Sequence, residues 1–88
     1  MGLYWWKYDT WGSGDFVRTV FHTGIPLGPD SGVVASITEL DSAGLPQAGQ
    51  ATLEVHNVVP KADGWVEVVA AIRWGSPLHY RITLMVIT

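Results

Sequence analysis

The sequence predicts an all-β fold, an antiparallel β-sandwich or barrel of about six strands. Apolar and polar residues alternate with a period of two through most of the chain, and no window longer than one turn keeps a helical period. Segments rich in glycine and proline separate the alternating stretches at intervals of roughly 8–15 residues, which is typical of antiparallel strands rather than of βαβ units. No internal repeat is present, so residues 1–88 are expected to form a single domain.

The first third of the chain is expected to hold two strands. Residues 3–8, "LYWWKY", form a strand that is aromatic on both faces, and residues 9–14 form a loop because they contain two glycines. Residues 1–14 are therefore an aromatic N-terminal strand and loop, followed by a core over 15–88. Residues 15–22 alternate β-favouring side chains between two faces. The connection at 23–32 contains two prolines and three glycines, and we expect it to cross between two sheets.

Four more strands are expected in the remainder, at residues 33–40, 50–58, 65–74 and 78–87. The last of them alternates most clearly, with one face formed by Tyr80, Ile82, Leu84 and Val86 and the other by His79, Arg81, Thr83 and Met85. The segment "PKADG" predicts a turn, because Pro60 fixes φ and Gly64 permits a positive φ. The connecting segments are residues 41–49, 60–64 and 75–77.

The composition predicts association with other chains. A chain of 88 residues has a thin stability margin, and small domains usually compensate with disulfides, metals or oligomerisation. Cysteine is absent, and the three histidines, His22, His56 and His79, show no metal-ligand spacing. The chain is 48% hydrophobic, only 15% charged, and contains five tryptophans. We therefore expect a homo-oligomer with no metal and no cofactor.

The charge pattern excludes several partners. A net charge of −3 and five scattered basic residues argue against nucleic acid. The longest apolar run is far short of the ~20 residues that span a bilayer, so no membrane insertion is expected. The aromatic N-terminus lacks the features of a cleaved signal peptide. The expected locations are the cytoplasm, a virion or other particle, or release without a cleaved signal.

No set of catalytic residues is visible. The sequence contains no cysteine nucleophile, G-x-S-x-G elbow, H-E-x-x-H zinc motif or Walker glycine pattern. "GSGDF" at 12–16 opens a strand rather than a helix and is expected to be an ordinary loop. Glu39 and Asp41 lie at the end of one strand, where a solvated strand edge is the simpler interpretation. We expect a protein that is not an enzyme.

Aromatic residues beside turns suggest ligand binding. Trp11 lies between Asp9 and Gly12, and Trp74 precedes Gly75. An indole offers a flat face to the C–H face of a sugar while nearby polar side chains bind its hydroxyls. The competing interpretation is that both tryptophans cap a core, because tryptophan is highly buried on average.

The N-terminal aromatic residues also allow two interpretations. Tyr4, Trp6 and Tyr8 lie on one face of an extended segment. They either line a ligand site or pack against a neighbouring subunit. The second interpretation is favoured, because interface cores are enriched in tyrosine and tryptophan.

Four segments, in order, resemble the H-type lectin family, of the snail agglutinin and discoidin C-terminal domain type. They are "RTVF" at 18–21, "IPLGP" followed by "VVASITELD" at 25–41, "LEVHNVVPKADGW" at 53–65 and "IRWGSPLHYRITLMVI" at 72–87. The resemblance covers residues 15–88. It implies a six-stranded antiparallel β-sandwich that assembles as a trimer, sometimes doubled to a hexamer. It also implies binding of galactose or N-acetylgalactosamine in shallow clefts between neighbouring subunits.

The resemblance also implies a set of site residues. Trp74 matches the binding tryptophan of the family, Gly75 takes the place of a sugar-binding histidine, and Gln50 takes the place of a binding arginine. Asp9 is the nearest candidate for an acidic ligand-binding residue. The expected rim of the site is formed by His79 or Tyr80.

These observations give two functional hypotheses. The first is a non-catalytic, lectin-like protein for galactose-type glycans. The second is a structural trimerisation or attachment module, for example of a phage tail or surface fibre. The replacement of the family's arginine and histidine by Gln50 and Gly75 favours the second, because charge-assisted hydrogen bonds are lost.

Overall fold

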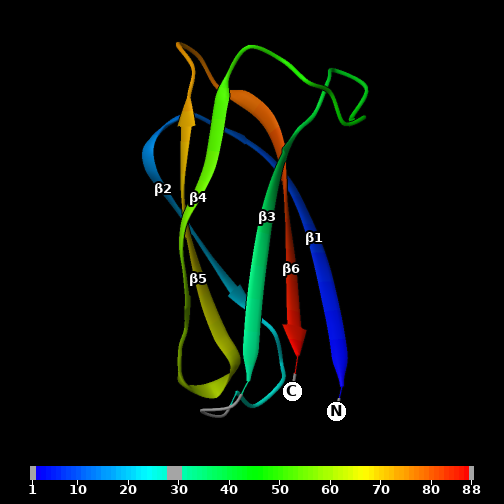
Figure 1. The fold of residues 1–88 in the computed structure, drawn as a ribbon, viewed down its shortest axis with the longest axis vertical. Helices are drawn as coiled ribbons and strands as arrows, with labels where there is room; N and C mark the ends of the chain where they lie inside the picture. The colour runs from blue at the N-terminus through cyan, green and yellow to red at the C-terminus, as the bar shows by residue number, and fades with distance from the viewer. Residues whose placement is uncertain (1, 28–30, 88) are drawn as a thin grey trace.

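Six antiparallel strands form two three-stranded sheets that pack face to face (Figure 1). A computed structural model describes residues 2–27 and 31–87. Sheet A has the order β1 (Leu3–Gly12), β6 (Leu78–Ile87), β3 (Gly32–Glu39). Sheet B has the order β2 (Gly14–His22), β5 (Trp65–Arg73), β4 (Thr52–Pro60). The predicted all-β architecture of six antiparallel strands is confirmed.

The chain changes sheet at every connection except one. Only β4 and β5 are consecutive neighbours within a sheet, and a short 3-10 turn, η1 (Ala62–Gly64), joins them. Asp63 and Gly64 both have a positive φ there, of 63° and 83°, as the glycine at this turn predicts. The expected crossing at 23–32 is confirmed, because it links β2 of sheet B to β3 of sheet A. No helix of the described residues is long and apolar enough to cross a membrane.

The predicted loop at residues 9–14 is wrong. β1 continues through Gly12, and only Ser13 separates it from β2. The cause is pairing with a distant strand, since Asp9 lies opposite Arg81 and Trp11 opposite His79 on β6. Gly14, with φ of 132°, supplies the backbone conformation for the corner between the sheets.

The core is built mainly from the inner faces of the two central strands. β5 contributes three large buried side chains to the cluster between the sheets, and β6 contributes alternate residues, as the period of two predicts. The buried cluster consists of Val66, Val68, Ile72, Tyr80, Ile82 and Leu84. The flanking strands cover this cluster only in part, so many of their large side chains remain exposed.

The edges of the two sheets differ in regularity. In sheet B, β2 has a bulge at Phe16, opposite Ala70 and Ala71 of β5, and β4 has a bulge at His56, opposite Val69 and Ala70. Phe16 has φ of 74°, which is costly for a bulky side chain. In sheet A, the registers of β1 and β3 with β6 run without a shift.

Replacing Leu84 with alanine is expected to destabilise the fold by about 2–5 kcal/mol, because it opens a cavity between the sheets. Met85, the next residue, lies on the outer face and is partly exposed. The matched Met85→Ala change is expected to cost less than about 1 kcal/mol. Urea unfolding followed by circular dichroism measures both, and equal losses would contradict the assignment of the two faces.

Candidate functional site

Two of the predicted ligand-binding residues, Asp9 and His79, lie near each other on the outer face of sheet A. Asp9 is directly opposite Arg81, and the next outward-facing pair along the two strands is Trp11 and His79. Successive outward pairs are about 7 Å apart along a strand. The β1–β6 pairing therefore gathers an aromatic pair and an ion pair in one small area.

Trp11 and His79 form a parallel stack. Their ring centroids are 4.5 Å apart and the ring planes differ by 4°. Trp11 is nevertheless 60% exposed. Because His79 covers one face of the indole, the opposite face is turned to solvent.

His79 is held in place by the loop that follows β3. Its Nδ1 lies 3.1 Å from the backbone oxygen of Asp41. A carbonyl only accepts, so Nδ1 donates this hydrogen bond and Nε2 is an acceptor when the ring is neutral. The side chain of Asp41 in turn accepts from the backbone N–H groups of Ala43 and Leu45, at 2.8 and 2.9 Å. Asp41 is thus a turn-forming residue that positions His79.

Asp9 and Arg81 form a bidentate ion pair. Nε of Arg81 donates to Oδ1 of Asp9 at 2.7 Å, and Nη2 donates to Oδ2 at 3.0 Å. The hydrogen bonds from Arg81 lower the pKa of Asp9, and the same bonds raise the pKa of Arg81. The carboxylate remains ionised, and each oxygen keeps a further lone pair for another donor.

These four residues make a shallow binding surface. A flat apolar ring face, backed by an imidazole, lies near a fixed carboxylate and a guanidinium. Such a combination suits a ligand with one apolar face and several hydroxyl groups. Sequence reasoning singled out Asp9, His79 and Trp11 separately but missed Arg81, whose only signal was its place in an alternating strand.

The other predicted residues, Trp74, Gly75 and Gln50, lie at one end of sheet B. Thr52 at the start of β4 pairs with Arg73 at the end of β5, so the residues just outside these strands leave the sheet at the same end. All three are exposed, and Trp74 is 45% exposed. Trp74 therefore does not fill the core, and its interpretation as a surface platform stands as a prediction.

The expected position of Tyr80 at the rim of a site is wrong. Tyr80 is only 2% exposed and belongs to the buried cluster between the sheets. This burial raises the pKa of its hydroxyl, while a hydrogen bond with Thr19 acts in the opposite direction. Tyr80 follows His79 by one residue, so it must face inward where His79 faces outward.

Glu39 is not part of a solvated strand edge. It is 8% exposed, and its Oε2 accepts a 2.6 Å hydrogen bond from Nε2 of Gln47. The backbone N–H of Gln47 also donates to the carbonyl of Glu39, at 3.0 Å. Glu39 therefore fixes the loop between β3 and β4.

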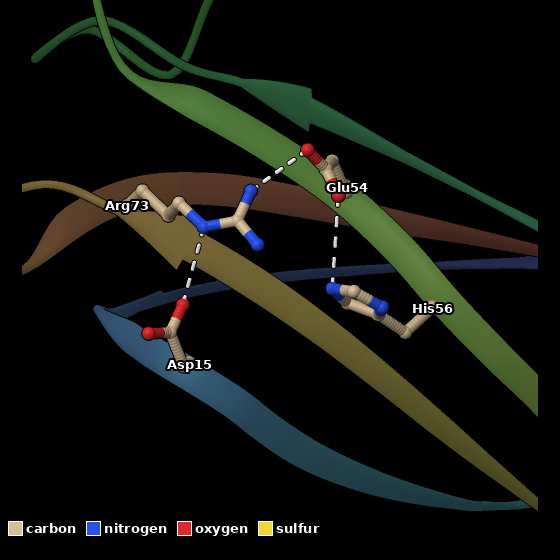
Figure 2. Close-up of polar contacts among 4 residues, drawn as sticks. All are labelled: Asp15, Glu54, His56 and Arg73. Carbon is tan, nitrogen blue, oxygen red and sulfur yellow. Dashed lines mark hydrogen bonds and ion pairs between the residues drawn. The ribbon is translucent and has the colours of Figure 1, made fainter.

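A second polar cluster, which the sequence did not predict, spans the outer face of sheet B (Figure 2). Nε of Arg73 is 3.3 Å from Oδ1 of Asp15, and its Nη1 donates to Oε1 of Glu54 at 2.8 Å. The other oxygen of Glu54 is 3.6 Å from Nε2 of His56. Hydrogen bonding to Glu54 raises the pKa of Arg73. The residues come from three strands, so their spacing in the sequence gives no signal.

This cluster lies directly beside the two bulges of sheet B. The rings of Phe16 and His56 meet edge to face, with centroids 5.2 Å apart. Val69 and Ala71, the outward residues of β5 at this level, are buried. The cluster braces two irregular edge strands against β5, and exposed pairs of this kind add little stability one by one.

The opposite end of the molecule carries an open pocket of about 520 Å³. Its lining residues are His22, Gly24, Ile25, Pro26, Leu27 and Asp63. It contains none of the predicted site residues. Within residues 2–27 and 31–87, no three histidine or acidic side chains lie close enough together to hold a metal ion.

Comparison of the chain with family models, curated proteins and solved structures gives no match. The similarity to H-type lectins therefore stays a resemblance carried by short segments. Any function must be argued from the geometry of the surface.

Replacing Arg81 with methionine is expected to raise the pKa of Asp9 toward its ordinary value of 3.8, because the hydrogen bonds that favour the carboxylate are lost. In the unaltered protein, the pair stabilises the fold above pH 3.8, and this contribution disappears as the pH falls through the lowered pKa. An NMR titration of the Asp9 carboxyl carbon measures both. An unchanged titration curve in Arg81→Met would contradict the ion pair.

Proposed function

We propose that this protein is a non-catalytic, lectin-like carbohydrate-binding protein for galactose- or N-acetylgalactosamine-type glycans. The observation that carries the proposal is the exposed face of Trp11, backed by His79 and flanked by the Asp9–Arg81 pair. Galactose-type sugars present a patch of C–H bonds on one face and hydroxyls around it, which matches this arrangement.

Each group has a distinct role in the proposed complex. The apolar face of the sugar packs on the exposed face of Trp11. The free lone pairs of Asp9 accept hydrogen bonds from hydroxyls, and the remaining N–H groups of Arg81 donate to them. His79 backs the indole on the side away from the sugar, and its hydrogen bond with Asp41 holds it there. Every contact is a stacking contact or a hydrogen bond, so binding is reversible and weak for a single site.

The resemblance adds a second exposed tryptophan to this proposal. It implies that Trp74, with Gln50 and Gly75, lines a cleft between neighbouring subunits of a trimer. The predicted residues fall into two groups, one on the outer face of sheet A and one at the end of sheet B. A cleft between subunits would bring the two groups together, because one chain would supply Trp74 and its neighbour would supply Trp11.

A structural attachment module is the second candidate, and one observation favours it. The outer face of sheet A carries a row of exposed apolar side chains near the start of β1. By register these residues are neighbours: Leu3, Trp5, Val34, Met85 and Ile87. Apolar patches on a sheet face commonly meet another protein.

A glycan array with the wild type, Trp11→Ala, Trp74→Ala and Trp65→Ala tests the proposal. We expect wild-type binding to galactose-type glycans and a loss of about tenfold or more in Trp11→Ala, because the stacking surface is removed. Trp65 is the matched control: it is an exposed tryptophan against a histidine, His22, at the other end of the molecule. Its replacement should leave binding unchanged.

The variants separate the two tryptophan platforms. A loss in Trp74→Ala as well supports the cleft that the resemblance implies. Loss in Trp74→Ala with full binding in Trp11→Ala would move the site to the end of sheet B and contradict the role of Trp11. A wild type that binds no glycan would favour the attachment module.

A further inference from the structure

β1 is an open sheet edge with neither a bulge nor a proline to block it. Figure 1 shows it at the border of sheet A, with no strand on its far side. Its ten residues pair with β6 without a bulge, and its sequence, "LYWWKYDTWG", contains no proline. A long regular edge strand exposes a row of backbone N–H and C=O groups that can pair with another chain.

The other three edges are protected. β2 and β4 are each interrupted by a bulge, and β4 ends in Pro60. Bulges and prolines are common devices that prevent pairing at an edge. β3 lies close to β4 of the opposite sheet without a ladder between them, so β4 obstructs a partner at this edge. The contrast singles out β1 as the edge available to a partner.

The side chains of β1 point to a partner on both faces. Trp5 and Trp11 are exposed on the outer face. Tyr4 and Tyr8, which face the inner side of the sheet, are also exposed. Tyrosine and tryptophan are the residues most enriched in the cores of protein interfaces.

We infer that β1 pairs antiparallel with β1 of a second copy of this chain, about a two-fold axis at Tyr8. In antiparallel pairing, directly opposed residues lie on the same face, so a two-fold axis must pass through a residue. An axis at Tyr8 places Lys7 opposite Asp9 of the second copy, and Asp9 opposite its Lys7. It also places Trp5 opposite Trp11 of the second copy, again twice.

The neighbouring registers lack this complementarity. An axis at Lys7 sets two lysines directly opposite each other, and an axis at Asp9 sets two carboxylates opposite each other. Like charges in directly opposed positions destabilise a strand pair. An axis at Trp6 leaves Lys7 opposite Trp5 and Asp9 opposite Leu3, with no charge partner across the interface. Only Tyr8 pairs both charges of the strand with opposite charges.

The pairing also bears on the glycan surface, and this consequence rests on the proposed function. Trp5 of the second copy would lie directly opposite Trp11, on the side away from His79, so the dimer and a sugar on Trp11 would compete for the same indole face. Asp9 can pair with Arg81 of its own chain and with Lys7 of the second copy, because its two oxygens offer about four acceptor positions and Arg81 occupies two. Formation of the dimer itself does not require a sugar.

A charge-exchange experiment with size-exclusion chromatography and light scattering tests the dimer. The assembly formed by the full chain in solution is expected to contain an even number of copies: two, or six if the dimer joins trimers. Lys7→Glu sets a carboxylate opposite Asp9 twice, and we expect its dimer to dissociate about tenfold or more readily. Lys61→Glu makes the same charge change on an exposed residue in the connection between β4 and β5 and should keep the dimer.

Mixing Lys7→Glu with Asp9→Lys chains gives a second readout. Each variant repels itself, but the mixed pair restores two opposite-charge contacts, so a heterodimer is expected. If circular dichroism shows that the Asp9→Lys variant does not fold on its own, the Lys7→Glu variant alone tests the inferred dimer. A wild type with one or three copies, or a Lys7→Glu dimer of unchanged affinity, would overturn the inference. So would a dimer that Val34→Lys on β3 disrupts and Lys7→Glu does not.

Sugar titration with a monovalent galactoside separates this inference from the proposed function. A Lys7→Glu monomer is expected to bind the sugar more tightly than the wild-type dimer, because Trp11 is uncovered; an unchanged affinity overturns this competition and leaves the inferred dimer standing. If neither the wild-type dimer nor the Lys7→Glu monomer binds the galactoside, the proposed function alone is overturned.

Discussion

Each sheet of this protein has three strands, so only one strand in each is central and four of the six are edges. The central strands β5 and β6 supply the whole buried cluster from their inner faces. Residues 2–27 and 31–87 form no further strand or helix that covers the flanking strands, and a small domain buries a small fraction of its surface. Exposed aromatic side chains and open backbone edges therefore follow directly from the architecture. The bulges of sheet B and the exposed side chains of β1 in sheet A are both related to this incomplete coverage of the edge strands.

The two sheets differ in the structure of their edge strands. Sheet B interrupts both of its edges with bulges and braces them with a polar cluster that runs from Asp15 through Arg73 and Glu54 to His56. The strained backbone of Phe16 belongs to the same arrangement, because its ring covers the outer face of β5 together with that of His56. Sheet A keeps straight edges and exposes aromatic and charged side chains on β1 instead. The sheet that does not block its edge is also the sheet that carries the candidate binding surface.

Local patterns in the sequence predicted the strands well and their ends less well. Alternation fixed the two faces of residues 78–87, because burial of one face is itself the cause of the pattern. The same alternation already grouped Tyr80 with the core residues Ile82 and Leu84, and its assignment to a rim came from the resemblance instead. The loop expected at 9–14 was wrong because glycine signals are local, whereas Asp9 pairs with a residue 72 positions away. The polar cluster of sheet B depends on two bulges, which no period in the sequence reveals.

Asp9 shows how binding and association can share one short strand. Its ion pair with Arg81 holds the carboxylate in a fixed orientation on the outer face, at the border of the sheet. A fixed carboxylate in that position is accessible both to a ligand above the sheet and to a cation across the edge. A shallow surface with one exposed indole binds a single sugar weakly, so useful affinity requires several copies of the site acting together. The trimer that the resemblance implies would supply those copies, whereas pairing through β1 would cover the indole and compete with the sugar. Because β1 is exposed at the edge of sheet A, sugar binding and self-association would both use its ten residues.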